Sequence, residues 1–281
     1  MVFTFLNSSL SRFRTYNILK NSIKNILIRR KNFPNNKLIA EKSIFLRRWE
    51  MAKKVKHKDV ENFLIHLNTN VPTEWVYKLA LPTQVSIKES KTNFQHGFIL
   101  YKALTNYIIN NKRKNYNIIE IGTAKGFSSL CMAKALDDLK VNGFIQTIDV
   151  LPHDMPMYWN SIMDHDGKQS RQQLLNEYKH LIDKYINFLH GESEKIFPTL
   201  DISRIHFAFI DGEHFYDNVI SDGENISKKQ EQGDILIFDD YTDLLFPGVV
   251  RAANEICEKF RYKRIKVFSS DERAYLIAEK L

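Results

Sequence analysis

The chain has 281 residues, of which 43% are hydrophobic and 12% aromatic, enough apolar material for a complete α/β core. No stretch approaches the ~18 consecutive apolar residues that a membrane-spanning helix needs, so an integral membrane protein is not expected. The two cysteines, Cys131 and Cys257, fall in apolar helical patterns. This placement indicates reduced core thiols of a cytoplasmic protein rather than a disulfide or a zinc site.

The formal net charge of +8 is unevenly distributed. Residues 1–60 contain 15 Lys or Arg against three acids, a net charge of +12, which leaves −4 for the remaining 221 residues. We therefore expect a basic, largely helical N-terminal extension over residues 1–80, followed by a catalytic domain over residues 81–281.

Within the extension, apolar residues recur every three or four positions between the basic ones: Phe13, Tyr16, Leu19, Ile23, Ile26 and Leu27. This pattern is typical of a basic amphipathic helix. Three interpretations stay open: packing on the catalytic domain, a peripheral contact of residues 1–34 with an anionic membrane or a partner, and an organellar transit segment, since residues 1–40 contain no acid. Nucleic-acid binding is not expected, because the extension contains no aromatic–basic module of a known type.

The first expected strand of the catalytic domain ends with the apolar run at 118–121, which leads through Gly-Thr-Ala-Lys-Gly (122–126) into a helix over Phe127–Leu139. A strand that feeds a glycine turn and a helix directs free backbone N–H groups and a positive helix end towards a ligand. The spacing does not fit the G-x-G-x-x-G pattern of dinucleotide-binding proteins. The residues expected to bind a cofactor here are Glu120, Gly122, Thr123, Ala124 and Gly126.

Two further strands are expected to complete this cofactor site. The strand Phe144–Ile148 ends in Asp149, 23 positions after Gly126, where nucleotide-binding folds place an acid that accepts hydrogen bonds from ribose hydroxyls. The strand Ile186–Leu189 is followed by Glu192 and Ser193, which either flank an adenine ring or cap a helix.

Acidic residues also follow the next two expected strands. Ile205–Ile210 ends in Asp211-Gly212-Glu213-His214, and Asp234–Phe238 ends in Asp239-Asp240. Because ligands of an open parallel sheet bind at the carboxyl ends of its strands, these acids are expected at the same rim as the glycine turn. Three converging carboxylates repel one another unless a proton or a cation neutralises them, and their hard oxygen donors suit Mg²⁺.

These motifs resemble those of a known enzyme family. The Glu-x-Gly-x-x-x-Gly pattern at 120–126 resembles motif I of the class I S-adenosylmethionine-dependent methyltransferases. The segments Phe-Ile-Asp-Gly-Glu-His-Phe-Tyr at 209–216 and Ile-Phe-Asp-Asp-Tyr at 237–241 are similar to those of the small-molecule O-methyltransferases of the macrocin-O-methyltransferase type. The resemblance covers roughly residues 85–281.

It implies a doubly wound, Rossmann-like, mostly parallel seven-stranded sheet with an antiparallel last strand, and S-adenosylmethionine as the cofactor. By position in the family motifs, the implied metal ligands are Asp211, Asp239 and Asp240, with Asp211 also close to the cofactor. His214 departs from the closest metal-dependent members. A helix over Pro247–Phe260 and two short strands over Arg264–Phe268 and Ala274–Ala278 fit the expected end of the fold.

The expected reaction is methyl transfer to a hydroxyl of a small molecule, a sugar or glycan precursor, with Asp211 or His214 taking the hydroxyl proton and Mg²⁺ assisting. The alternatives are methyl transfer to another acceptor, such as a nitrogen atom or a nucleic acid, and an inactive cofactor-binding interaction module. A homo-oligomer is compatible with the sequence. The long insertion Leu151–Tyr185 carries Met-Pro-Met-Tyr-Trp at 155–159, which either covers the acceptor or packs on the fold.

Overall fold

The structure, a computed structural model, describes residues 37–67, 69–270 and 273–281. The expected amphipathic helix from Phe13 to Leu27 lies outside these residues, as does the predicted membrane contact or transit role of residues 1–34. The division of the chain at residue 80 stays a prediction.

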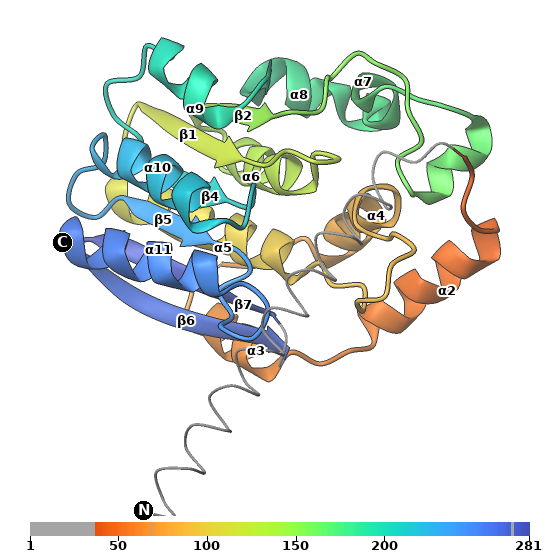
Figure 1. The fold of residues 1–281 in the computed structure, drawn as a ribbon, viewed down its shortest axis with the longest axis horizontal. Coiled ribbons are helices and arrows are strands. Elements are labelled where there is room, and N and C mark those ends of the chain that lie inside the picture. The colour runs from red at the N-terminus through yellow and green to blue at the C-terminus, as the bar shows by residue number, and fades with distance from the viewer. Residues whose placement is uncertain (1–36, 68, 271–272) are drawn as a thin grey trace, which may run out of the picture.

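A single seven-stranded sheet with the strand order β3-β2-β1-β4-β5-β7-β6 forms the centre of the fold (Figure 1). Strands β1 to β5 are parallel, β7 runs antiparallel to β5, and β6 runs antiparallel to β7. The strands are β1 (Asn115–Ile121), β2 (Asn142–Asp149), β3 (Ile186–His190), β4 (Phe207–Ile210), β5 (Ile235–Phe238), β6 (Tyr262–Ser270) and β7 (Arg273–Lys280). The predicted mixed, Rossmann-like sheet with antiparallel pairing at its end is confirmed.

The central strands are apolar on both faces, because helices cover both sides of the sheet. All four residues of β4 are buried. The hairpin of β6 and β7 is longer than expected from the sequence, since its cross-strand pairing extends from Tyr262 and Lys280 to Ser270 and Arg273. Apolar alternation marks only the central part of that hairpin, which explains the difference.

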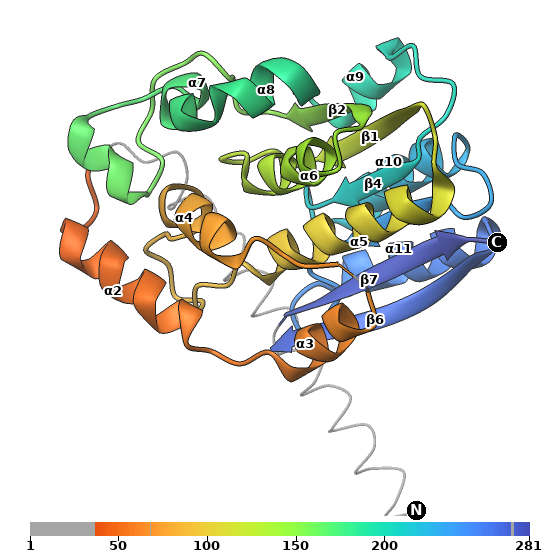
Figure 2. The same ribbon diagram turned by 180° about the vertical axis from the view of Figure 1, so that it is seen from behind.

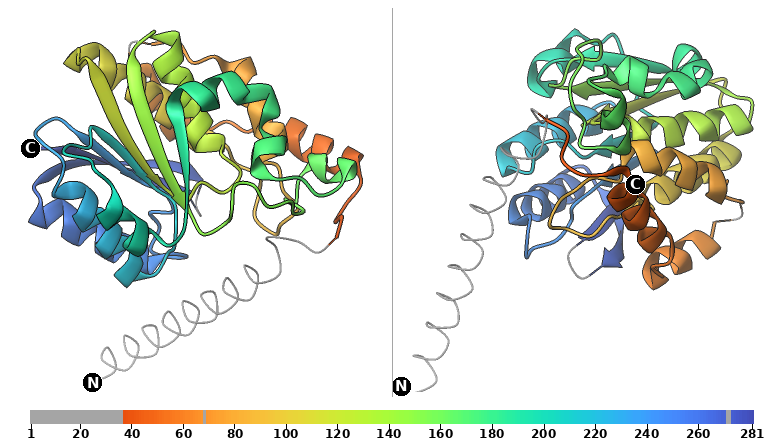
Figure 3. Two further views of the ribbon diagram at one scale, coloured as in Figure 1. Left: turned by 90° about the horizontal axis from the view of Figure 1, so that it is seen from above. Right: turned by 90° about the vertical axis from the view of Figure 1, so that its right-hand side faces the viewer.

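The helices form two layers, one on each face of the sheet (Figure 2 and Figure 3, left). Helices α5, α6 and α8 contribute to one apolar cluster, and α10 and α11 contribute to the other. These helices are α5 (Gln95–Asn111), α6 (Phe127–Asp138), α8 (Lys179–Tyr185), α10 (Tyr216–Ser227) and α11 (Pro247–Lys259), with the one-turn helix α9 (Ser193–Ile196) after β3.

From residue 37 on, three helices precede this core: α2 (Lys42–Lys53), α3 (Lys58–Ile65) and α4 (Thr73–Thr83). Val60 of α3 and Val76 of α4 are fully buried in the cluster that also contains α5 and α6 residues. Trp49 of α2 donates a hydrogen bond from Nε1 to the carbonyl of Tyr77 at 2.8 Å. These helices therefore pack on the sheet-bearing core, and α2 and α4 lie beyond the carboxyl ends of β1 and β5 (Figure 1).

The insertion between β2 and β3 is partly helical. It contains the short helices η1 (Ile162–Asp166), α7 (Arg171–Leu174) and η2 (Asn176–Tyr178) before α8, and a further short helix, η3 (Phe197–Thr199), follows α9. Trp159 is fully buried, and its Nε1 donates to the carbonyl of Gln169 at 2.7 Å. For this aromatic residue the packing interpretation holds. Across the described ranges, none of the helices has the length and apolar character required to span a membrane.

A buried carboxylate fixes the start of β5. The Asp234 side chain is fully buried and accepts hydrogen bonds from Tyr107 Oη at 2.6 Å and from Arg204 Nη2 at 2.9 Å. The backbone N–H of Glu231 donates to its other oxygen at 2.7 Å. Asp234 thus joins α5, the segment before β4 and the turn before β5.

We predict that Asp234→Ala lowers the free energy of unfolding by ~3–5 kcal/mol, because it leaves Arg204 without its buried partner. Glu231→Ala is the matched control: Glu231 pairs with the same arginine, but its side chain is 65% exposed. We expect that control to cost under ~1 kcal/mol. Urea unfolding of the two variants measures both values, and equal losses would contradict the assignment.

Candidate active site

The glycine turn after β1 lies directly against the backbone after β4. Gly122 has φ +96°, and a Cβ atom added to it would lie 2.1 Å from the carbonyl oxygen of Asp211. Any side chain at position 122 would therefore separate the two turns. Ala124, at φ 46°, and Gly126, at φ 86°, also have left-handed backbone conformations, so three of the five turn residues turn the chain sharply beneath the start of α6.

Buried polar side chains form a hydrogen-bond network next to this turn. Glu120 is fully buried, and its Oε2 accepts hydrogen bonds from Ser129 and from Thr147, the latter at 2.5 Å. Thr123 Oγ1 in turn contacts Thr147 Oγ1 at 2.5 Å. Burial raises the pKa of Glu120, and these hydroxyl donors oppose the shift. Within the described residues Glu120 Oε1 has no hydrogen-bond partner, so one buried acceptor beside the turn is unsatisfied.

Asp149, at the end of β2, is hydrogen-bonded to the turn itself. Its Oδ2 accepts from the backbone N–H of Ala124 at 2.6 Å, and its Oδ1 accepts from the N–H of Leu151 at 2.7 Å. The loop after β3 reaches the same point through its backbone, where Gly191 N–H donates to the Asp149 carbonyl at 2.9 Å. The structure thus brings the proposed ribose acid and the glycine turn together.

Glu192 and Ser193 make other contacts. Glu192 is 60% exposed and forms an ion pair with Lys195 at 2.7 Å, and Ser193 is hydrogen-bonded to the Asp222 side chain. Neither side chain contacts a residue of the glycine turn. Burial raises the pKa of Asp222 to about 6, with the Ser193 hydrogen bond opposing that shift.

Arg171 of the insertion is a site residue that the sequence did not indicate. It is almost fully buried, its Nε donates to the carbonyl of Ala124 at 2.8 Å, and its Nη2 lies 3.8 Å from Asp149 Oδ2. The guanidinium also lies 5.6 Å from the ring centres of Trp159 and Phe188, within cation–π range. In the described part of the chain Nη2 forms no hydrogen bond, so a buried donor is unsatisfied near the unsatisfied acceptor of Glu120.

A second group of side chains gathers at the carboxyl ends of β4 and β5. Asp211, His214 and Asp240 each offer one ligand atom, and these atoms lie within 4.8 Å of one another. His214 Nε2 and Asp240 Oδ2 are 2.5 Å apart, and the His214 ring packs at 4.5 Å against Phe246. Asp240 has φ 53°, an uncommon conformation for a residue other than glycine, which turns the chain out of β5 towards this group.

Asp239, expected in the same ligand set, has a different partner. Its side chain is fully buried, and its oxygens accept from Arg273 Nε at 3.2 Å and Nη2 at 2.5 Å and from the Asp240 N–H at 2.6 Å. Burial raises the pKa of Asp239, whereas Arg273 opposes that shift. Burial also opposes the charge of Arg273, but the neighbouring carboxylates outweigh it and hold the guanidinium pKa above its ordinary value. The structure therefore gathers His214 with Asp211 and Asp240, and ties Asp239 to β7.

Lys125 extends from the glycine turn into the protein interior. Its side chain is buried, and Nζ donates to Ser86 Oγ at 2.7 Å and to the Trp159 carbonyl at 3.1 Å. Burial lowers the pKa of Lys125 to about 7, the charge of Lys88 lowers it further, and Asp164 opposes the shift. The glycine turn is thereby fastened to the insertion and to the segment before α5.

This buried amine predicts a pH-dependent stability. Between pH 7 and 10.5 the unfolded chain keeps a proton on Lys125 that the folded protein releases, so the free energy of unfolding rises with pH across that window. In Lys125→Met this contribution is absent. We expect the stability of the wild type relative to Lys125→Met to increase by a few kcal/mol from pH 7 to pH 10.5. Lys78→Met, at a 65% exposed position, is the control and should show a flat difference.

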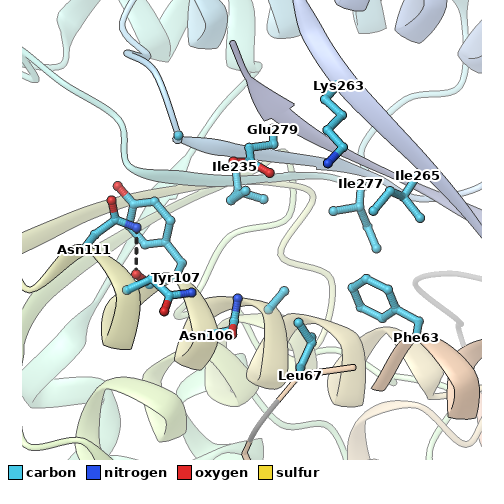
Figure 4. Close-up of a pocket in the computed structure, with 13 residues that line it drawn as sticks. Phe63, Leu67, Asn106, Tyr107, Asn111, Ile235, Lys263, Ile265, Ile277 and Glu279 are labelled. Carbon is cyan, nitrogen blue, oxygen red and sulfur yellow. Dashed lines mark hydrogen bonds between the residues drawn. The ribbon is translucent and has the colours of Figure 1, made fainter. Parts of the chain in front are cut away.

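A separate cavity of about 380 Å³ lies at the other end of the sheet, between α3, α5 and the antiparallel strands (Figure 4). Phe63, Leu67 and Ile277 supply apolar walls, and Asn106 and Lys263 supply polar ones. It is beside the amino end of β5, and none of the expected site residues lines it.

Comparison with known proteins agrees with this geometry. Residues 119–241 match the family model described as a methyltransferase domain, a range that includes the glycine turn, Asp149 and the acids after β4 and β5. Among curated proteins, the uncharacterized protein R132 of Acanthamoeba polyphaga mimivirus is 42% identical over 70 residues, which cover 24% of this chain and 32% of that protein. The chain thus matches about a third of that relative's length.

Two solved structures share the fold. The O-methyltransferase NovP is 16% identical, with a TM-score of 0.53 over 73% of this chain and 88% of its own. Cofactor-bound Rv0187 from MTB is 15% identical, with a TM-score of 0.50 over 81% of this chain and 98% of its own. Residues 119–241 thus match a methyltransferase domain, and the strand order and these two structures show the same Rossmann-like fold.

Proposed function

We propose that the protein transfers the methyl group of S-adenosylmethionine to a hydroxyl of a small molecule, a sugar or glycan precursor, with the help of a divalent cation. The observation that carries this proposal is the group formed by Asp211, His214 and Asp240, at the same rim as the glycine turn. The contact of Gly122 with the Asp211 backbone brings the cofactor turn and this group together. The description of NovP as an O-methyltransferase supports the choice of a hydroxyl acceptor.

The residues around the turn fit the proposed cofactor. S-adenosylmethionine carries an ammonium group, a carboxylate and ribose hydroxyls, so it needs both donors and acceptors. Glu120 Oε1 and Arg171 Nη2 are buried beside the turn without hydrogen-bond partners in the described chain. Asp149 is the proposed ribose ligand, and the bound cofactor supplies a methyl group on a positively charged sulfur.

The acidic group fits a small hard cation. Mg²⁺ is usually held by one or two carboxylates and keeps several waters, and Asp211 and Asp240 supply two carboxylates on adjacent strands. A cation here would lower the pKa of a hydroxyl bound beside it. Asp239 stays outside the ligand set that we propose, because Arg273 and the Asp240 N–H already occupy its oxygens.

His214 is the proposed base. Its contact with Asp240 at 2.5 Å and its packing on Phe246 fix the plane of the imidazole ring. In this arrangement His214 takes the hydroxyl proton, and the Asp240 carboxylate stabilises the resulting imidazolium. A base placed in this way contributes a factor of about 10²–10⁴ to the rate.

We predict that EDTA abolishes methyl transfer and that added Mg²⁺ restores it. The assay follows tritium-labelled methyl groups from S-adenosylmethionine into a metabolite extract. Asp240→Asn should lose at least ~100-fold in rate, whereas Asp243→Asn, which changes an exposed acid of the same segment, should keep the wild-type rate. Full activity in metal-free protein would exclude the cation and leave His214 alone. Absence of transfer under all conditions, with intact cofactor binding, would favour an inactive binding module.

A second prediction separates the base from the cation. His214→Ala should lower the rate by about 10²–10⁴-fold near pH 7, and the loss should shrink at high pH, where hydroxide replaces the missing base. Cofactor affinity should stay near the wild-type value, because the cofactor is proposed to bind on β1 and β2. His180→Ala, at an exposed position, is the control. A loss that does not change with pH would contradict the proposed role.

A further inference from the structure

Lys88 precedes α5, and its charge acts together with those of the glycine turn and of the acidic group. Its side chain is accessible to solvent, but charged groups surround it. Those whose charges act on it are Asp211 after β4, Asp239 and Asp240 after β5, and Arg273 of β7. Its own charge acts on Lys125 of the glycine turn and on His96 at the start of α5. The Lys88 side chain is therefore close enough to both the glycine turn and the acidic group for its charge to act on them.

The backbone that carries Lys88 is held firmly, although it forms no helix or strand. Arg48 of α2 donates from Nη2 to the Lys88 carbonyl at 3.0 Å and from Nη1 to the Ser86 carbonyl at 3.4 Å. The Asn160 side chain accepts from the Ile87 N–H at 2.9 Å and donates to the Ile87 carbonyl at 3.0 Å. Three consecutive residues are thus fixed by α2 and by the insertion.

Lys125 adds a link from the cofactor turn to the same segment, through its hydrogen bond to the Ser86 hydroxyl at 2.7 Å. The base of the Lys88 side chain therefore has a fixed position relative to the glycine turn. Such an arrangement is unnecessary for a lysine that only keeps the surface soluble, but it is needed to present a charge to a ligand.

The ammonium of Lys88 has no partner among the described residues: no hydrogen bond or ion pair joins it to the nearby carboxylates. Withdrawal from water and the repulsion of Arg273 lower the pKa of Lys88, whereas Asp240, Asp211 and Asp239 raise it. With the cation of the proposed function in place, the three carboxylates are balanced by that cation and Arg273. Lys88 then contributes a positive charge that the site itself does not neutralise.

We propose that Lys88 is a ligand-binding residue that pairs with an anionic oxygen group, a carboxylate or a phosphate, of a molecule bound between the glycine turn and the acidic group. Two sources of this group are chemically equivalent for a lysine. One is the carboxylate in the amino-acid part of the cofactor. The other is an acidic group on the acceptor, a source that rests on the proposed function.

The first experiment measures cofactor-type ligands by calorimetry. S-adenosylhomocysteine carries the carboxylate, and 5′-methylthioadenosine lacks the whole amino-acid part. If the cofactor is the source, Lys88→Met weakens S-adenosylhomocysteine binding by about 10- to 100-fold and leaves methylthioadenosine binding unchanged. Lys88→Arg keeps the charge and most of the affinity. Lys91→Met, at an exposed lysine three positions further on, is the matched control.

The second experiment titrates inorganic pyrophosphate into wild-type protein saturated with S-adenosylhomocysteine. If the acceptor is the source, Lys88→Met binds S-adenosylhomocysteine normally but loses at least about tenfold in pyrophosphate affinity, and Lys88→Arg retains it. Added salt should weaken this binding, because it pairs opposite charges.

The proposal is overturned if Lys88→Met behaves like Lys91→Met in both titrations. Thermal unfolding of each variant, expected to match the wild type, shows that a loss of binding is not a loss of fold. Neither titration measures methyl transfer. A failure of the proposed hydroxyl methylation would therefore be seen in the EDTA assay alone, and a failure of the Lys88 assignment in the titrations alone.

Discussion

The close approach of Gly122 to the backbone of Asp211 is the constraint on which the site depends. The turn after β1 and the turn after β4 can touch only because position 122 has no side chain, and a Cβ atom there would lie 2.1 Å from a carbonyl oxygen. The Asp211 N–H is bonded to the Ile121 carbonyl at 2.8 Å, so the strand pairing continues into this contact. The glycine turn and the acidic residues after β4 are thereby neighbours although almost ninety positions separate Gly122 from Asp211.

Charge pairing then decides what each acid can do. Asp239 and Asp240 are neighbours in the sequence, but alternation along β5 directs the first into the protein, and the left-handed backbone of Asp240 directs the second to the rim. Arg273 neutralises the buried carboxylate, which would otherwise be a costly unpaired charge. Asp240, which is partly buried, lies beside His214 and Asp211. Arg273 thus gives the two neighbouring acids different roles: Asp239 is held in a structural ion pair, and Asp240 lies in the group that we propose for the chemistry.

Much of this arrangement could be predicted from local patterns. Apolar runs located the strands, the glycines marked the tight turn after β1, and the acids at 211 and 239–240 marked the ends of β4 and β5, because these features depend on residues close together in the chain. The cations that complete the site could not be found in this way. Arg273 is 34 positions from Asp239, and Arg171 is 47 positions from Ala124, so only the tertiary pairing reveals them. Hydrophobic periodicity carries no information about which distant carboxylate or carbonyl a basic side chain will meet.

The position of Arg273 on β7 has a consequence for how the molecule is assembled. β7 follows every other strand in the chain, yet it is inserted between β5 and β6. Until it arrives, the carboxylate of Asp239 has no cation to accompany it into the interior, and the acids after β5 repel one another. The pairing of β7 with β5 and the neutralisation of the Asp239 charge by Arg273 therefore occur in the same step. In a nascent chain with only β1 to β5 folded, water would still hydrate the Asp239 carboxylate, which forms an ion pair with Arg273 in the complete protein. The acidic group after β5 therefore reaches its final arrangement only when β7 has joined the sheet.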